Sequence, residues 1–156
     1  MKTLVIIPTY NESENVEWIT KAILENQPQV NILIADDNSP DGTGDIADSL
    51  AENDARIFVL HRAGKEGLGA AYRAGFAWGL ERDYDVLVEM DADGSHRPED
   101  LGKLLESAEG GAALTLGSRW VPGGSVVNWP KRREWLSRGA SLYARSLLGL
   151  KVKDTT

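Results

Sequence analysis

The chain has 156 residues, which is long enough to bury one hydrophobic core and short for two, so it predicts a single folded domain. Its composition, 42% hydrophobic and 26% charged, is that of a globular protein, and the absence of cysteine excludes disulfides, thiolate metal sites and a cysteine nucleophile. The net charge of −7 argues against a general nucleic-acid-binding protein and against broad attraction to anionic membranes.

The charge is distributed unevenly along the chain. Residues 1–118 carry nine Lys and Arg against 22 Asp and Glu, a balance of −13. Residues 119–156 carry eight Lys and Arg against two Asp and Glu, a balance of +6. Any functional interpretation has to explain this asymmetry.

The predicted elements alternate between strands and helices. Five short apolar runs each predict a strand buried on both faces, at residues 4–7, 32–35, 57–60, 86–90 and 113–116. Helical patterns fill the gaps between them and start after Ser13, at Thr43, at Leu68 and at Pro98. This order predicts an α/β fold with a mostly parallel, doubly wound sheet, whose ligands bind at the carboxyl ends of the strands.

The pattern changes after Gly117. Residues 120–130, rich in Gly, Pro and Val, predict a loop, and residues 131–150 predict a basic helix. Its apolar positions form one stripe, at Leu136, Ala140, Tyr143, Leu147 and Leu150. The first apolar run is too short for a secretory signal and no run is long enough to span a bilayer, so we expect neither in these 156 residues.

Acidic pairs follow two of the predicted strands at the ligand-binding edge. Asp91 and Asp93 come directly after the run 86–90, and alternate carboxylates in an extended loop can both face one divalent cation that keeps positions open for a substrate phosphate. Asp36 and Asp37 follow the second run, where a carboxylate can accept a base N–H or a ribose hydroxyl. The simpler interpretations are a strand end or helix cap for the first pair and a turn for the second.

Common nucleotide, phosphate and calcium motifs are absent from the sequence. No Gly-x-Gly-x-x-Gly fingerprint follows the first strand, and no Walker A sequence, EF-hand loop or Gly-x-Ser-x-Gly elbow occurs. The Gly-rich segment 64–71 opens the third helix, so its N–H groups and Lys65 could contact a phosphate or a sugar. A plain turn explains that segment equally well.

Five segments carry a family pattern. They read Val5-Ile6-Ile7-Pro8-Thr9-Tyr10-Asn11-Glu12, Asp36-Asp37-Asn38-Ser39-Pro40-Asp41-Gly42-Thr43, Gly67-Leu68-Gly69, Met90-Asp91-Ala92-Asp93-Gly94-Ser95-His96 and Gly117-Ser118-Arg119. Together they resemble the inverting glycosyltransferases of family two, and within that family the dolichol-phosphate (polyprenol-phosphate) mannose synthases. The resemblance implies a GT-A fold, a Rossmann-like three-layer α/β/α sandwich, as one catalytic domain over residues 1–156. Residues 1–118 would form its nucleotide and metal half and residues 119–156 a basic acceptor-side segment.

The resemblance also implies a reaction: mannose passes from GDP-mannose to a dolichyl or polyprenyl monophosphate with inversion, which gives a β-linked product. The donor nucleotide is expected at Pro8, Tyr10, Glu12, Ala35, Asp37, Asp91, Ala92 and Asp93. Mg²⁺ or Mn²⁺ is expected on Asp91, Asp93 and Ser95, and the catalytic residues are expected to be Asp91, Asp93 and Arg119. Ser95 stands where some relatives carry Gln, and Gly94 where Leu is frequent, a departure that we expect the site to tolerate.

The basic segment is expected to bind the acceptor phosphate, because guanidinium groups suit a phosphate monoester. Similarity to a family stretch assigns this role to Arg119, Arg133, Ser137 and Arg138. Trp120, Trp129 and Trp135 suit a surface at the level of lipid headgroups, so we expect peripheral contact with the cytoplasmic face of a membrane. A solvated basic helix face is the alternative interpretation.

The end of the sequence, Lys153-Asp154-Thr155-Thr156, is similar to the start of a family motif after which relatives continue. We therefore expect an incomplete catalytic domain. Three other functions remain open at this point: transfer of glucose or another sugar from a UDP-sugar, a haloacid-dehalogenase-like phosphatase using the Asp-x-Asp sequence, and a nucleotide-sugar-binding fragment without activity.

Overall fold

The computed structural model describes residues 1–119, 121, 130–149 and 154. The chain divides into two compact units, Met1–Ala113 and Leu114–Thr156, and this boundary lies close to the change in charge after Ser118. Most of the predicted loop 120–130 lies outside the described residues, and so do Trp120, Trp129 and Leu150.

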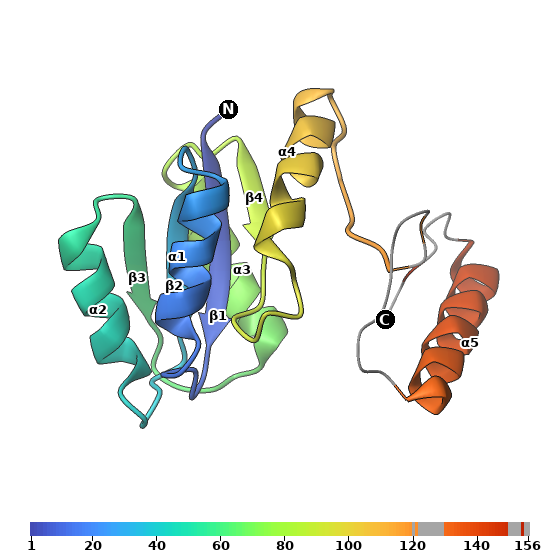
Figure 1. Cartoon of the computed structure of the whole chain (residues 1–156), viewed down its shortest axis with the longest axis horizontal. Helices are drawn as coiled ribbons and strands as arrows, with labels where there is room; N and C mark the ends of the chain where they lie inside the picture. Colours follow the sequence, from blue (N-terminus) through green and yellow to red (C-terminus); the bar gives the residue numbers. More distant parts are fainter. Residues whose placement is uncertain (120, 122–129, 150–153, 155–156) are drawn as a thin grey trace. The chain divides into compact units, whose positions relative to one another are not determined.

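The first unit is built on a four-stranded parallel sheet with the order β3-β2-β1-β4 (Figure 1). The strands are β1 (Thr3–Thr9), β2 (Asn31–Asp36), β3 (Ile57–His61) and β4 (Val86–Glu89). The helices between and after them are α1 (Val16–Asn26), α2 (Thr43–Asn53), α3 (Leu68–Leu80) and α4 (Leu101–Glu109), with a short 3₁₀ turn, η1 (Pro98–Asp100), leading into α4. Four of the five predicted strands and all four predicted helices of this unit are confirmed.

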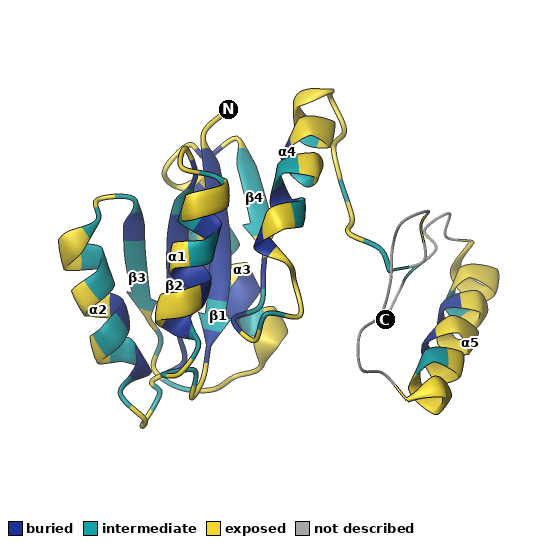
Figure 2. Cartoon of the chain, viewed as in Figure 1, coloured by how far each residue is buried: buried dark blue, intermediate teal, exposed yellow. Residues whose placement is uncertain are grey.

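The core lies on both faces of the sheet, because successive side chains of a strand point to opposite faces. Val5 and Ile7 pack with α1, α2 and α4 on one face. Leu4 and Ile6 pack with α3 on the other, which makes three layers. The central strands β1 and β2 are almost wholly buried, whereas β3 and β4, at the edges of the described sheet, are largely half-buried (Figure 2).

Helix α3 packs directly against β1 at a glycine. A Cβ placed on Gly75 would come within 2.5 Å of Cγ2 of Ile6, so this position excludes any side chain. Close packing of this kind leaves the helix little freedom to shift along the sheet.

The predicted strand at residues 113–116 is wrong. Within the described residues no strand follows β4, and Ala113, Leu114 and Leu116 are exposed. A strand gains its stability from cross-strand neighbours, and this short run is bounded by glycines that raise the entropic cost of an extended conformation.

In the second unit, the predicted basic helix is confirmed as α5 (Lys131–Leu148). Its apolar stripe is not buried: Leu136, Tyr143 and Leu147 are each more than 60% exposed, while Ser137 and Ser141 are buried. Among the helices that the structure describes, none is both long and apolar enough to cross a membrane.

Candidate active site

The loops after β1 and β2 leave the carboxyl edge of the sheet side by side. Pro8 pairs in register with Ala35 and Thr9 with Asp36, and the Asp37 N–H donates a hydrogen bond of 3.0 Å to the Thr9 carbonyl. The register therefore places the expected nucleotide residues of the two strands next to one another.

Three hydrogen bonds join these two loops beyond the sheet. The backbone N–H groups of Asn11, Glu12 and Ser13 donate to side-chain oxygens of Ser39, Thr43 and Asp41, at 3.1, 3.0 and 3.1 Å. Hydrogen bonds from the Thr43 hydroxyl and from backbone N–H groups hold the pKa of Asp41 well below its ordinary value. These hydrogen bonds hold the two loops together at the carboxyl edge of the sheet.

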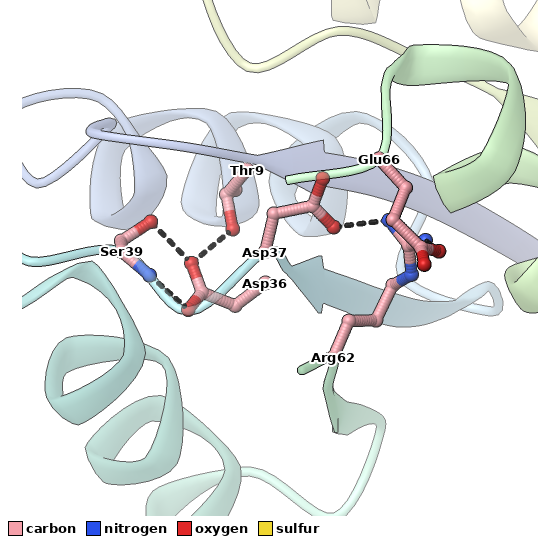
Figure 3. Close-up of polar contacts among 6 residues, drawn as sticks. All are labelled: Thr9, Asp36, Asp37, Ser39, Arg62 and Glu66. Atoms are coloured by element: carbon pink, nitrogen blue, oxygen red, sulfur yellow. Dashed lines mark hydrogen bonds and ion pairs between the residues drawn. The ribbon is translucent and has the colours of Figure 1, made fainter. Parts of the chain in front are cut away.

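Asp36 has a structural role. It is buried and accepts hydrogen bonds from the hydroxyls of Thr9 and Ser39, at 2.8 and 2.6 Å, and from the Ser39 N–H at 3.0 Å (Figure 3). The turn predicted for this acidic pair is confirmed at Asp36, whose two oxygens are both used inside the loop.

Asp37 forms an ion pair with Arg62, a residue that the sequence analysis missed. Nη1 of Arg62, which follows β3, bonds to Oδ1 of Asp37, and both side chains are more than 90% buried (Figure 3). Nη2 of Arg62 donates to the exposed Glu66 at 2.8 Å. The position of Arg62 directly after a predicted strand was the signal that could have found it.

The remaining expected nucleotide residues differ in how accessible they are. Tyr10 is partly exposed, with Nζ of Lys65 4.0 Å from the centre of its ring. Pro8 is half-buried, and Glu12 accepts a 2.8 Å hydrogen bond from the Asn15 amide. Ala35 has no exposed surface in this structure.

The acidic loop after β4 emerges beside β1, because the Met90 N–H donates to the Ile6 carbonyl at 3.1 Å. Within the loop, the Ser95 N–H donates to Oδ1 of Asp93 at 2.9 Å, and the Asp91 N–H donates to Nδ1 of His96 at 3.0 Å. Hydrogen bonds from the backbone and side chain of Ser95 lower the pKa of Asp93, so this carboxylate is ionised at neutral pH. Ala92, between the two acids, is buried in the core.

Asp91 accepts a hydrogen bond of 2.8 Å at Oδ1 from the phenolic hydroxyl of Tyr72, a residue of α3. Tyr72 is buried, and burial together with this hydrogen bond raises its pKa far above the ordinary value. Nothing in the local sequence pattern connects Tyr72 with the acidic loop.

The donor set of this loop suits a hard divalent cation. Asp91 and Asp93 each use Oδ1 in a hydrogen bond from the protein. In the part of the chain that the structure describes, no group of three or more His, Cys, Asp or Glu is arranged to hold a metal. Magnesium-type sites commonly take one or two protein carboxylates and complete their coordination with water and substrate phosphate, so the residues fit such an ion.

The expected acceptor residues belong to the second unit. Arg119 is engaged by Asp154, whose carboxylate accepts from the backbone N–H, Nε and Nη2 of Arg119 at 3.0, 2.8 and 2.6 Å. Arg138 forms an ion pair of 2.9 Å with Glu134. Ser137 is buried, and the backbone N–H of Arg133 donates to the Pro130 carbonyl in the first turn of α5.

A parallel sheet between helix layers, with an Asp-x-Asp loop at its carboxyl edge, is the arrangement of GT-A glycosyltransferases. The family profile of glycosyl transferase family 2 matches residues 4–156, and the chain belongs to this family. The haloacid-dehalogenase-like alternative is therefore not favoured.

Curated relatives carry names of one enzyme class. A polyprenol monophosphomannose synthase of Mycolicibacterium smegmatis is 59% identical over 99% of this chain and 59% of its own length. An undecaprenyl-phosphate mannosyltransferase of Micrococcus luteus is 55% identical over all of this chain and 64% of its own length. A dolichol-phosphate mannosyltransferase of Pyrococcus furiosus is 41% identical, with 43% of its length covered. The chain thus spans between 43% and 64% of the length of these relatives.

Solved structures support the fold. A mannosyltransferase of Pyrobaculum calidifontis, solved with GDP-Man and Mn²⁺, matches 67% of this chain and 31% of its own with a TM-score of 0.57 and 23% identity. TarS of S. aureus matches 70% of this chain and 32% of its own with a TM-score of 0.53 and 19% identity. At these identities the likeness concerns the α/β architecture.

Proposed function

We propose that this chain forms the donor-binding part of an inverting mannosyltransferase that uses GDP-mannose and a polyprenyl or dolichyl monophosphate. The observation that carries the proposal is the carboxyl edge of the sheet, where Asp37 follows β2 and Asp91 and Asp93 follow β4, on either side of β1. The names of the relatives at 41 to 59% identity support the sugar and the acceptor class.

The two acidic sites would bind different parts of the donor: Asp37 the base, and Asp91 and Asp93 the metal ion and diphosphate. Asp37, held by Arg62, would accept an N–H group of the base, and Tyr10 would border its ring once Lys65 moves aside. Pro8, Glu12 and the backbone near Ala35 and Ala92 would complete the contacts with the nucleotide.

Asp91 and Asp93, with Ser95 beside them, would hold Mg²⁺ or Mn²⁺. When bound, such an ion stabilises the negative charge that develops on the departing diphosphate. The structure of the P. calidifontis neighbour, which contains Mn²⁺ with GDP-Man, supports the use of a divalent ion.

The acceptor needs alignment more than activation. A phosphate monoester is anionic near neutral pH, so its oxygen can attack the anomeric carbon of mannose without a strong general base. The C1–O bond to GDP breaks as the new bond forms on the opposite face, which inverts the α-linked donor to a β-linked product. Arg119, Arg133, Ser137 and Arg138 would bind the acceptor phosphate, and phosphate would compete with Asp154 for the Arg119 guanidinium.

We also propose that α5 contacts the cytoplasmic face of a membrane peripherally. Its exposed surface combines Trp135, Tyr143 and leucines with Lys131, Arg132, Arg133 and Arg145. Aromatic and basic residues on one helix suit an interface with anionic lipid headgroups.

Titration with nucleotide sugars tests the donor. We expect GDP-mannose to bind more tightly with Mn²⁺ than in EDTA, and more tightly than UDP-glucose or GDP-glucose. A preference for UDP-glucose would instead favour a glucosyltransferase, and the failure of every nucleotide sugar to bind would refute the proposal. Binding of GDP-mannose without transfer to a polyprenyl phosphate would identify the 156-residue chain as a binding fragment.

A further inference from the structure

We infer that Tyr72 is a positioning residue for the Asp-x-Asp loop: its hydroxyl holds the carboxylate of Asp91 in one orientation for the divalent cation. This inference rests on the proposed function, because it needs a cation at Asp91. It assigns a role to a helix residue outside the five segments that carry the family pattern.

The packing around the Tyr72 ring holds its hydroxyl rigidly in place. The Tyr72 ring is 7% exposed, belongs to the apolar cluster of Leu4, Ile6 and Leu33, and stacks on Phe76 with ring centres 6.3 Å apart. Helix α3 itself is held against β1 at Gly75, where there is no room for a Cβ. The phenolic oxygen therefore has a fixed position relative to the sheet.

The hydrogen bond joins helix α3 to the loop after β4. Tyr72 and Asp91 are 19 residues apart, and the O–H donates to Oδ1 at 2.8 Å. Because Asp91 is only half-buried, its carboxylate would otherwise rotate about its terminal bond. The hydrogen bond to Oδ1 restrains this rotation and sets the direction in which the carboxylate faces a cation, which is how outer partners orient metal-binding carboxylates.

The variant Tyr72→Phe tests the inference, since it removes the hydroxyl and keeps the ring. We expect the dissociation constant of Mn²⁺, measured by electron paramagnetic resonance in the presence of GDP, to rise by about tenfold. The affinity for GDP in EDTA should be unchanged, because the base contacts at Asp37 do not involve Tyr72. Mn²⁺ affinity equal to that of the wild type would overturn the inference.

Tyr84→Phe is the matched control. Tyr84 is equally buried in the same cluster, and its hydroxyl accepts a 2.6 Å hydrogen bond from Asn31 at the amino end of the sheet. Loss of Mn²⁺ affinity in both variants, or loss of GDP affinity in EDTA, would show that Tyr72 acts only through the fold.

A double substitution separates this inference from the proposed function. In an Asp91→Asn background, Tyr72→Phe should change Mn²⁺ affinity no further, and an undiminished effect there would refute action through Asp91. If the wild-type chain shows no Mn²⁺-dependent binding of GDP, the proposed function and this inference both fail. If it does and Tyr72→Phe matches it, only the inference fails.

Discussion

At Asp91 and Asp93, a hydrogen bond from the protein decides how each carboxylate meets a ligand. Tyr72 occupies Oδ1 of Asp91, and the Ser95 N–H occupies Oδ1 of Asp93. In the proposed function, two carboxylates held in this way would leave most of the coordination of a divalent ion to water and diphosphate. We therefore expect the ion to bind well only together with the nucleotide.

Asp93→Asn is expected to remove the Mn²⁺-dependent part of GDP-mannose affinity, because an amide lacks the charge that holds a hard cation. The loss should be at least about tenfold, the cost associated with even an outer partner of a metal ligand. Calorimetric titration with Mn²⁺ and in EDTA measures it, with Asp45→Asn on the exposed side of α2 as control. An unchanged affinity would remove Asp93 from the site.

Gly94 has a conformational reason to be glycine. Its φ is +74°, and a Cβ there would approach Cη2 of Trp18 to 3.1 Å. We expect Gly94→Leu to destabilise the fold by about 1–2 kcal/mol through backbone strain alone. Urea unfolding measures this, and Gly64→Leu, at a position where nothing lies within 4 Å of a Cβ, should cost clearly less. Equal costs at the two positions would contradict the explanation.

At the scale of elements, local sequence patterns predicted the helices and strands whose formation depends on nearby residues. Helix α3 begins at Leu68, as its pattern predicts, and strands β1 to β4 form at the predicted runs. The residues after each strand lie at the carboxyl edge, because parallel strands all end there. Distant partners decide whether residues 113–116 form a strand. They also decide the contact of Tyr72 with Asp91 and the pairing of Arg62 with Asp37, and no local pattern carries that information.

The turn between α2 and β3 contains an ion pair, between Asp54 and Arg56, whose contribution to stability depends on pH. Asp54 accepts hydrogen bonds from the backbone N–H, Nε and Nη2 of Arg56, which lower its pKa to about 2, and Nη1 of Arg56 donates to the Pro28 carbonyl. A depressed folded pKa means that the stability is present above the unfolded value of 3.8 and is lost as pH falls towards 2.

Asp54→Asn should therefore lower the free energy of unfolding by about 1 kcal/mol at neutral pH, a figure kept small because solvent screens a partly exposed pair. The difference from the wild type should shrink as pH falls through the window between the two pKa values. Urea titrations across this range measure it. A difference that stays constant down to the lower pKa would exclude the carboxylate as its cause.

At the scale of the whole molecule, the charge asymmetry follows the division into units. The acidic part carries the sheet and its two apolar clusters. In the described residues of the second unit, 114–119, 121, 130–149 and 154, the buried side chains are Ser137 and Ser141, while most large apolar side chains of α5 are exposed. A helix with a polar buried face and an exposed apolar surface gains little stability from packing.

Hydrogen exchange should reveal this difference. We expect amides of β1 and β2 to exchange only through global unfolding, and amides of α5 to exchange orders of magnitude faster, because protection follows burial. Addition of anionic vesicles containing polyprenyl phosphate should slow exchange in α5 and leave β1 and β2 unchanged. Vesicles of neutral lipid alone should protect α5 less, since the basic residues then have no counter-charge.

The double variant Arg132→Glu, Arg133→Glu separates a membrane contact from a solvated helix face. Two charge reversals should abolish flotation with the anionic vesicles and the slowed exchange of α5, because each basic residue near an anionic surface contributes about 1 kcal/mol. GDP-mannose affinity in solution should be kept, since the proposed donor residues all belong to the first unit. Unchanged flotation would leave α5 a solvated basic helix and would also count against Arg133 as a ligand of the acceptor phosphate, so the balance of +6 would then need another explanation.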